Sequence, residues 1–312
     1  MTDTGVNRDR GAPPMASAPC FRHLSEAPDL DFMVGCARRA AKAAILPRFQ
    51  SLSGLASTRK FRFDDIVTIA DRDAEKMITA EVRSRWPDSC VIGEESVSDG
   101  VALVSDIVRA ARTFVIDPLD GTWNFAHGLP LFGVILALVD HGKTVAGVLY
   151  DPITDDAVLA AKGKGAYFCA TDGTLRLLRA SASRNVPDMI GFSGHGLLDK
   201  AVQRRLAEPL THFHRVLSLR CSCHEYRMLA AGHAQFVIGG NLNPWDHLAG
   251  ALVVTEAGGH AALLTGAAYG ADCRKGILVA ASSLQTWKDV ADVIADPLEL
   301  PPENRTVTEA TI

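Results

Sequence analysis

The sequence predicts a chain of the α+β and α/β classes, with a mostly antiparallel sheet in its first half and alternating strands and helices in its second. Three observations lead to this prediction: a helical spacing of apolar residues, short apolar runs after it, and an alternation of segment types in the second half. Up to about residue 180, apolar residues recur at helical spacing and then in short runs separated by turn residues; beyond it, strand-like and helix-like segments alternate. The 312 residues, 47% hydrophobic and 22% charged, suffice for one large domain or two medium ones.

Two helices are expected first, over 28–49 and 71–86, because apolar residues recur three or four apart and Pro47 and Pro87 stop the patterns. Short apolar runs bounded by turn residues then predict strands over 89–93, 113–116, 131–139, 144–150, 157–161 and 165–169. The run "DHGK" between the third and fourth of these strands predicts a hairpin.

The second half reads as an alternation of strands and helices. The expected strands are 188–192, 216–219, 234–238, 260–264 and 277–281, and the expected helices are 197–208, 222–231, 244–257 and 284–295. The polar stretch "RASASRNVPD" predicts a boundary near residue 180. We therefore expect a disordered leader over 1–24, an α+β metal-binding half over 25–180, an α/β half over 181–296 and a flexible tail over 297–312. Met15 is a second candidate start.

Composition excludes several classes of protein. The longest apolar run, 131–139, is much shorter than the roughly 20 residues that cross a bilayer, and the leader has no apolar stretch of a secretory signal. The net charge of −4 comes without a basic block, so we expect no nucleic-acid partner and no membrane. Seven scattered cysteines without a CxxC pair indicate reduced thiols in a cytoplasmic protein.

Acidic residues stand where several apolar segments break off. The segments "VIDPLDGTWNF", "CVIGEES", "NPWDHLAG" and "DDIVTIAD" contain Asp117 and Asp120, Glu94, Asp246 and Asp71 respectively. Each has a local explanation: Asp-Pro and Asp-Gly favour turns, and Asp246 falls at the third position of a helix capped by Asn243. If the segment ends converge, however, up to five negative charges need cations, and an all-oxygen set suits two Mg²⁺ ions.

These motifs carry a resemblance. "IGEES", "VIDPLDGTWNF" and "NPWDHLAGALVVTEAGG", in that order with "DDIVTIAD" upstream, resemble the inositol monophosphatase family of lithium-sensitive, magnesium-dependent sugar phosphatases, over about residues 30 to 295. The resemblance implies a layered α-β-α-β-α sandwich, with an N-terminal mostly antiparallel sheet and a C-terminal mixed sheet. It also implies a homodimer.

The resemblance also assigns residues. Glu94, Asp117 and the carbonyl of Leu119 would bind one Mg²⁺, and Asp117, Asp120 and Asp246 a second. Glu94 with Asp71 would hold a third through waters, giving two or three Mg²⁺ per active site. Small phosphate monoesters would be hydrolysed by metal-activated water, with catalytic residues Thr122, Asp71 and Glu94. The implied substrate-binding residues are Asp120, Gly121, Thr122, Arg220, Ser222 and Asp246, and the resemblance implies that Gly121 and Thr122 open a helix whose N–H groups bind the phosphate.

The substrate side departs from the animal-type pattern. Arg220-Cys221-Ser222 stands where that pattern has Gly-Thr-Ala or Gly-Ser-Ala, Gly239 stands where it has a Glu that contacts inositol, and Trp123 replaces the commoner Thr. We therefore expect a broad phosphatase that accepts inositol 1-phosphate, with Gly239→Glu shifting preference toward inositol. In the alternative, Arg220 reads a second phosphate. Glu225 and Arg227 could add polar contacts or form a helix-surface ion pair.

Three functions stay open from the sequence. The first is an inositol-1-monophosphatase-like activity. The second is fructose-1,6-bisphosphatase, 3′(2′),5′-bisphosphate nucleotidase or histidinol-phosphatase activity. The third is non-enzymatic, as a partner in transcription antitermination; the near-neutral charge gives it no support, and the complete carboxylate set argues against a purely structural role.

Overall fold

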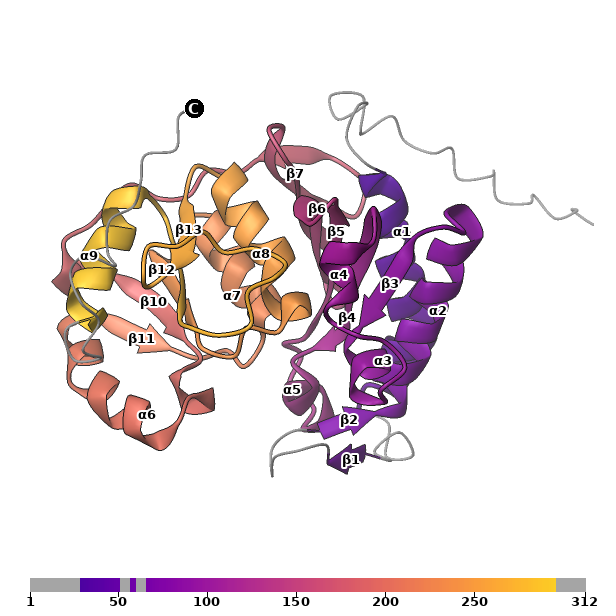
Figure 1. Ribbon diagram of the computed structural model, residues 1–312, viewed down its shortest axis with the longest axis horizontal. Helices are drawn as coiled ribbons and strands as arrows, with labels where there is room; N and C mark the ends of the chain where they lie inside the picture. The colour runs from indigo at the N-terminus through magenta and orange to yellow at the C-terminus, as the bar shows by residue number, and fades with distance from the viewer. Residues whose placement is uncertain (1–28, 51–56, 60–65, 296–312) are drawn as a thin grey trace, which may run out of the picture.

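The computed structural model describes residues 29–50, 57–59 and 66–295. Five layers follow one another across it (Figure 1): a pair of helices, a seven-stranded sheet, a second pair of helices, a five-stranded sheet and a last helical layer. The predicted layered sandwich is confirmed. The predicted leader over 1–24 and the tail over 297–312 lie outside the described residues.

The first sheet is built from consecutive strands. Its order is β3 (Cys90–Gly93), β4 (Arg112–Asp120), β5 (Gly133–Asp140), β6 (Lys143–Asp151), β7 (Asp156–Ala161), β8 (Gly165–Cys169) and β9 (Leu175–Leu177). Only β3 and β4 pair in parallel, so the sheet is mostly antiparallel, as predicted. β5 and β6 form the predicted hairpin around residues 141 and 142.

The second sheet is mixed. Its order is β11 (Arg215–Leu217), β10 (Ile190–Ser193), β12 (Phe236–Gly239), β14 (Leu278–Ala281) and β13 (His260–Leu263). β10 is parallel to both of its neighbours, whereas β14 is antiparallel to β12 and β13. Both sheet types therefore agree with the expectation from sequence.

The helices fill the spaces between and outside the sheets. α1 (Leu30–Ala40) and α2 (Ile69–Arg85) cover the outer face of the first sheet. α7 (Ser222–Ala230) and α8 (Pro244–Glu256) lie between the two sheets, and α9 (Leu284–Ala295) covers the far face of the second, with α6 (Lys200–Ala207) at the edge of that layer (Figure 1).

Side-chain alternation along β5 separates two cores. Val134, Leu136 and Leu138 pack toward α1 and α2. Ile135, Ala137 and Val139 pack toward α7 and α8. Successive side chains of a strand point to opposite faces, so an unbroken apolar run is what a strand covered on both faces requires. This explains why the run over 131–139 is apolar at every position except Gly133.

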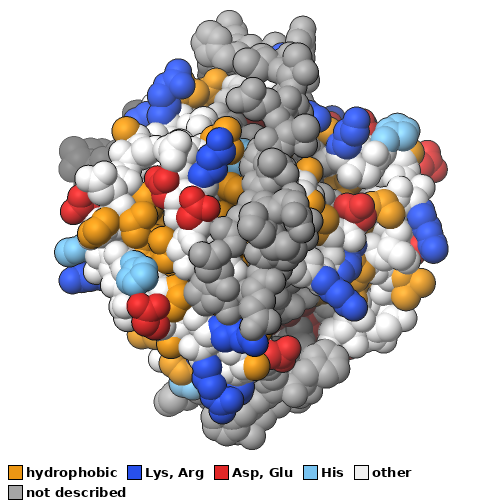
Figure 2. All heavy atoms as spheres, turned by 60° about the vertical axis from the view of Figure 1, so that its left-hand side comes forward, with side chains coloured by type: hydrophobic (Ala, Val, Ile, Leu, Met, Phe, Trp, Pro, Cys, Tyr) orange, Lys and Arg blue, Asp and Glu red, His pale blue; other side chains and the backbone are white. Residues whose placement is uncertain are grey.

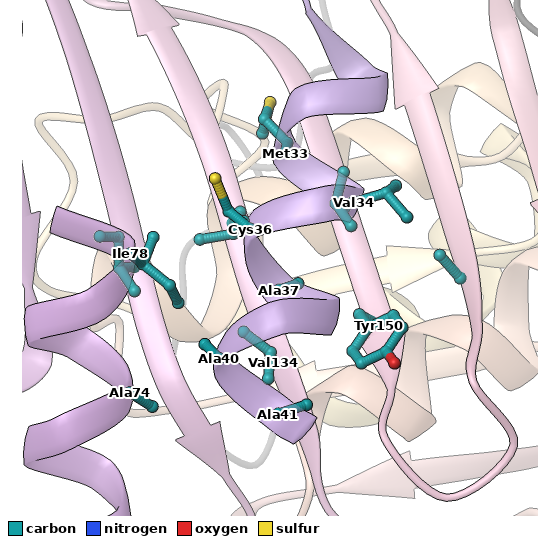
Figure 3. Packing of buried hydrophobic residues seen from close by; sticks show 14 of the residues in the cluster. Met33, Val34, Cys36, Ala37, Ala40, Ala41, Ala74, Ile78, Val134 and Tyr150 are labelled. Atoms are coloured by element: carbon teal, nitrogen blue, oxygen red, sulfur yellow. The ribbon is translucent and has the colours of Figure 1, made fainter. Parts of the chain in front are cut away.

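Small residues let helices approach the first sheet closely. Figure 3 shows Ala37 and Ala40 of α1, and Ala41 directly after this helix, beside Val134 and Tyr150 of the sheet. On the other face, a Cβ atom at position 147 of β6 would lie 2.9 Å from the Cα atom of Ala249 in α8, closer than real side chains approach. Gly147 is therefore required by the packing of α8 on the strand.

Several short elements were not predicted. They are β1 (Ser57–Arg59), β2 (Ile66–Thr68), β9, α3 (Glu94–Ser98) and α4 (Asp106–Arg109), whereas the single-turn α5 (Thr122–Ala126) is the helix that the resemblance implies after Gly121. The first helix also continues beyond Ala40 as a π-helical turn over Ala41–Ile45 and a 3₁₀ turn over Leu46–Arg48. The predicted strand over 113–116 is longer than expected, because β4 runs through the acidic motif to Asp120.

Charged side chains are mixed on the surface. On the face drawn in Figure 2, Lys and Arg side chains alternate with Asp and Glu across the described residues. None of the described helices is both long enough and apolar enough to cross a membrane. The predicted absence of a nucleic-acid partner stays a prediction.

Candidate metal and phosphate site

Three carboxyl groups meet where β4 ends against the first turn of α8. One carboxylate oxygen from each of Asp117, Asp120 and Asp246 lies within 4.8 Å of the other two. Asp117 and Asp120 are buried in β4, and Asp246 is partly buried in α8. Residues more than 120 positions apart in the sequence are thus brought together, as the convergence of segment ends predicted.

A bulge in β4 turns the first two carboxylates to the same side. Residues three apart in a regular strand point to opposite faces of the sheet. Here Asp117 pairs with Ile135 and Asp120 with Gly133, so three residue steps in β4 match two in β5. The extra residue restores a common side for both carboxylates. The Asp117 carboxylate also accepts the N–H of Leu119 at 3.1 Å, which fixes this turn.

Asp120 is anchored by the start of α7. The Cys223 N–H donates to its Oδ2 at 2.5 Å, and the Cys221 thiol donates to the same atom at 3.2 Å. The Ser222 N–H also acts on this carboxylate, and a helix N-terminus favours negative charge. Burial nevertheless raises the pKa of Asp120 to about 6, since these hydrogen bonds offset only part of the desolvation.

The cluster fits a divalent cation. Burial raises the pKa of Asp117 and of Asp246 well above the ordinary value, and the nearby Glu94 and Asp120 raise both further. A hydrogen bond between these two carboxyl groups raises the pKa of Asp117 further and opposes the rise at Asp246. Asn243 donates to Asp246 at 3.1 Å. Hard divalent cations prefer oxygen ligands, and a bound cation offsets the repulsion between buried carboxylates.

Glu94 and its neighbour Glu95 have different surroundings. Glu94 begins α3 and lines the same cavity as Asp120 and Asp246. Glu95 is buried elsewhere, 3.8 Å from Arg72. The structure therefore places Glu94 beside the carboxylate cluster, although its oxygens lie outside the group formed by the three aspartates.

Glu75 supports this segment, although no pattern in the sequence singles it out. Its carboxylate accepts the N–H groups of Glu95 and Ser96 at 2.7 and 2.8 Å. A Cβ atom at Gly93 would lie 2.2 Å from the Glu75 carboxyl carbon. A buried carboxylate thus occupies the space beside Gly93 and fixes the start of α3. In the sequence, Glu75 lies two helical turns into α2 and cannot be told from an ordinary surface acid.

Asp71 and Thr122 form a pair next to the cluster. Asp71 lies in the first turn of α2, where its Oδ2 accepts from the Thr68 N–H at 2.8 Å and from the Thr68 hydroxyl at 2.5 Å. Its other oxygen lies 3.0 Å from the Thr122 hydroxyl, which is also 2.9 Å from the Leu119 carbonyl oxygen. Burial, assisted by Glu94, raises the pKa of Asp71 to about 7.

Gly121 and Thr122 open α5, as predicted, but this helix has only five residues. Gly121 has a φ of 85°, which a side chain rarely adopts, and a Cβ atom there would lie 3.0 Å from the Leu131 carbonyl oxygen. The turn can direct backbone N–H groups toward an anion, whereas a helix this short contributes little dipole.

A cavity of about 490 Å³ extends from the carboxylates into the space between the two halves of the chain. Predicted site residues Glu94, Asp120, Gly121, Thr122, Arg220, Ser222 and Asp246 all line it. Asp71, Asp117 and Leu119 lie behind this wall, buried. Trp123 and Gly239, at which the sequence departs from the animal-type pattern, also line the cavity.

The surroundings of Gly239 change one expectation. A Cβ atom there would lie 2.8 Å from Cε1 of His247. That ring is held at both nitrogens, by the Tyr226 hydroxyl at 2.9 Å and the Asn241 carbonyl oxygen at 2.8 Å. Burial lowers the pKa of His247 to about 4, so the ring is neutral. A glutamate at position 239 would meet this ring before reaching substrate, so we no longer expect Gly239→Glu simply to favour inositol.

The ion pair considered for Glu225 and Arg227 is not formed between them. Arg227 pairs with Asp156 and donates to the Leu149 carbonyl oxygen at 2.8 Å. Glu225 is buried and accepts the Leu219 N–H at 2.8 Å, in the segment that precedes α7. Residues two apart on a helix point in different directions, which explains why they do not meet.

Together, the layered fold and a carboxylate cluster beside a hydroxyl–carboxylate pair define a class of metal-dependent phosphatases. Comparison with known proteins agrees with this class. The family model described as "Inositol monophosphatase family" matches residues 27–298. Because the match spans most of the sequence, the chain belongs to the inositol monophosphatase family.

Individual relatives carry several names. A protein of Thermotoga maritima named fructose-1,6-bisphosphatase/inositol-1-monophosphatase is 34% identical over 64% of this chain and 72% of its own length. Inositol monophosphatase 1 of Bos taurus is 30% identical over 77% and 84%, and the Nus factor SuhB of Pseudomonas aeruginosa is 32% identical over 75% and 86%.

The fold is also that of solved relatives. The crystal structure of the extragenic suppressor protein suhB from Bartonella henselae superposes with a TM-score of 0.73 at 29% identity, covering 85% of this chain and 97% of that one. The inositol monophosphatase of Thermotoga maritima gives a TM-score of 0.71 at 27% identity, covering 86% and 98%.

Proposed function

We propose that the chain is a Mg²⁺-dependent phosphatase of small phosphate monoesters that accepts inositol 1-phosphate among other polyol and sugar phosphates. The observation that carries the proposal is the position of Asp117, Asp120 and Asp246. They form a cation-demanding cluster beside a cavity whose wall holds the Thr122 hydroxyl, bonded to Asp71. Phosphate ester hydrolysis needs charge neutralisation and a positioned proton acceptor, and both lie at this one place.

Five groups of the chain would hold the metal. They are Glu94, Asp117, Asp120, Asp246 and the carbonyl oxygen of Leu119, with Asp71 behind Glu94, and the family resemblance implies two or three Mg²⁺ ions. When bound, Mg²⁺ supplies Lewis-acid stabilisation of phosphate charge and a nucleophilic water at neutral pH. The same resemblance implies inhibition by Li⁺.

The chain's own groups do the remaining work. The N–H groups of the Gly121–Thr122 turn would bind a phosphate oxygen. The Thr122 hydroxyl would orient the attacking water, and Asp71 would orient the hydroxyl through the bond of 3.0 Å. Burial raises the pKa of Asp71 to about 7 in the metal-free protein, and bound cations would oppose this rise, so Asp71 would accept the hydrogen bond as a carboxylate.

Further parts of the proposal rest on the family alone. They are a homodimeric state and a cytoplasmic location. The relatives named SuhB keep a second candidate open, a partner in transcription antitermination, and the Thermotoga maritima name supports sugar bisphosphates as candidate substrates. The complete carboxylate cluster favours the enzymatic function, because a purely structural partner has no need of buried, repelling charges.

Phosphate release from a panel of esters tests the proposal. Turnover should require Mg²⁺ and stop with chelator, and Asp117→Asn should lower kcat by roughly a thousandfold, since a group worth about 4 kcal/mol of charge stabilisation is lost. Asp188→Asn, an exposed aspartate at the surface of the second sheet, is the matched control and should keep full activity. Full activity of Asp117→Asn, or turnover unaffected by chelator, would overturn the assignment.

A further inference from the structure

We propose that Arg220 binds a second anionic group of the substrate, so that among phosphate monoesters this chain prefers those carrying another phosphate or a carboxylate. This inference rests on the proposed phosphatase function and names the substrate class of the same cavity. Its basis is the place of the Arg220 guanidinium, which lies in the cavity wall over the ring of Trp123, with the guanidinium carbon 4.4 Å from the ring centroid.

The cavity wall carries charged groups of both signs. The carboxylates of Glu94, Asp120 and Asp246 line the part where metal and the reacting phosphate would bind, and the carboxyl group of Glu225 lies beside Arg220. Among the described residues that line the cavity, Arg220 is the only Lys or Arg. Its guanidinium is charged at every physiological pH and can bind a phosphate or carboxylate through two parallel hydrogen bonds. A second anion on the substrate is what this group recognises best.

The left-handed backbone conformation of Arg220 indicates that its side chain has a function. Its φ is 52°, in the left-handed region that glycine adopts freely and that other residues adopt at an energetic cost. Glycine at this position, as in the animal-type pattern, would relieve that cost. Strained backbone that persists at the wall of a functional cavity is a sign of function.

Neighbouring groups hold Arg220 in this position. Glu225 accepts the Leu219 N–H at 2.8 Å, and the N–H of Arg220 acts on the same carboxylate. Ser218 accepts the Arg220 N–H at 3.3 Å. The Trp123 ring is itself stacked with His127 at 4.1 Å. Glu225 is therefore a positioning residue, which sets the backbone angle from which the guanidinium reaches the cavity.

This arrangement reduces the side-chain conformational entropy that is lost when a ligand binds Arg220. A free arginine side chain has many rotamers, and immobilising it opposes binding. Stacking on Trp123 already restricts the Arg220 side chain, while the fixed backbone restricts its origin. A second anion therefore finds a preorganised partner, and we expect its effect to appear mainly in KM.

Matched substrate pairs test the inference. We would measure kcat/KM with Mg²⁺ for glycerol 2-phosphate against 2-phosphoglycerate, and for fructose 6-phosphate against fructose 1,6-bisphosphate. The first pair adds a carboxylate and the second a phosphate. Wild type should favour the doubly anionic member, and Arg220→Gly should lower kcat/KM by about ten- to a hundredfold for that member alone, the range expected for loss of a charge-assisted hydrogen bond.

Two further variants separate position from charge. Arg220→Lys should keep part of the preference, because it retains charge but loses the planar pair of donors. Glu225→Gln should raise KM for the doubly anionic member more than it raises KM for glycerol 2-phosphate. The melting temperature of Arg220→Gly should equal or exceed that of wild type, which shows that the variant folds and that left-handed strain is relieved.

The outcomes are distinguishable. Equal losses on both members of each pair, or no loss on either, would overturn the role of Arg220. A preference confined to one pair would show whether carboxylate or phosphate is the group read. If wild type releases no phosphate from any ester, the proposed function fails; in that case, Arg220→Gly binding fructose 1,6-bisphosphate as tightly as wild type by calorimetry would overturn this inference as well.

Discussion

The two regions of the cavity are built in different ways. At the carboxylate end, side chains come from β4, α2 and α8, and each is held by hydrogen bonds to neighbouring backbone or side-chain groups. At the other end, Arg220 extends from a segment without regular structure. Its backbone is left-handed, and Trp123 and the buried Glu225 keep it in place.

The difference explains why one end can change while the other stays. Moving any one carboxylate alters the charge balance of the whole cluster, because the buried groups raise one another's pKa values. A change at Arg220 or Trp123 alters one contact with substrate and leaves that balance intact. The chemistry is thus expected to be fixed by the fold, and the choice of substrate by single residues in the wall.

Of the changes that compare the two ends of the cavity, Asp246→Asn is expected to have the largest effect, on the Mg²⁺ requirement. Asp246 contributes one of three clustered carboxylates but is less buried than Asp117, so its loss should weaken the second metal rather than abolish the site. We expect a ten- to hundredfold rise in the Mg²⁺ concentration for half-maximal activity, about 1.4 to 2.8 kcal/mol of binding free energy.

Inhibition by Li⁺ should weaken in parallel, since the resemblance places Li⁺ at that second metal position. Activity titrated with Mg²⁺ and then with Li⁺ gives both values, and Asp188→Asn serves again as the control. If millimolar Li⁺ leaves turnover unchanged in wild type, this position differs from that of the family.

A smaller effect is expected at the other end, from Gly239→Ala. The added methyl group would meet the His247 ring at 2.8 Å, and that ring is held at both nitrogens. Overpacking of this kind costs about 1–3 kcal/mol of unfolding free energy. The cost should fall when His247→Ala is already present, because the obstructing ring is gone. Chemical denaturation of the four proteins of this cycle measures the coupling, and additive effects would show that the ring yields freely.

Periodicity and turn residues were enough to predict most of the fold. Helices α2, α7, α8 and α9 and the strands of both sheets other than β9 lie within a few residues of the expected ranges, because their apolar patterns reflect burial on one or two faces. The missed elements are short ones such as α3, α4 and β9, for which no period can be seen in so few residues. β4 was truncated because its acidic end looks like a loop.

The acidic residues of the site were also predictable, whereas their supports were not. Asp117, Asp120 and Asp246 stand out as charges at the ends of apolar runs. Glu75 and Glu225 look like ordinary helix-surface acids, although each accepts backbone N–H groups far from its own helical turn. The contact between Gly239 and His247 depends on how α8 lies against β12, which no local pattern reports.

The central claim is that the carboxylate cluster is a metal site, and the most direct measurement is the melting temperature with and without Mg²⁺ at pH 8. Folding raises the pKa of Asp71 to about 7 and of Asp120 to about 6, above their unfolded value of 3.8. The stability these groups contribute is therefore present below about pH 4 and lost as the pH rises to about 7, so at pH 8 both carboxyl groups are ionised in the metal-free protein and add negative charge at the cluster.

Mg²⁺ at a hundred times its dissociation constant should then stabilise wild type by about 2.7 kcal/mol, a rise of about 5 °C or more. Metal-free Asp117→Asn should melt at or above the temperature of metal-free wild type, because it has one less buried charge, and it should gain little from Mg²⁺. An equal gain in both proteins, or no gain in wild type, would contradict the account.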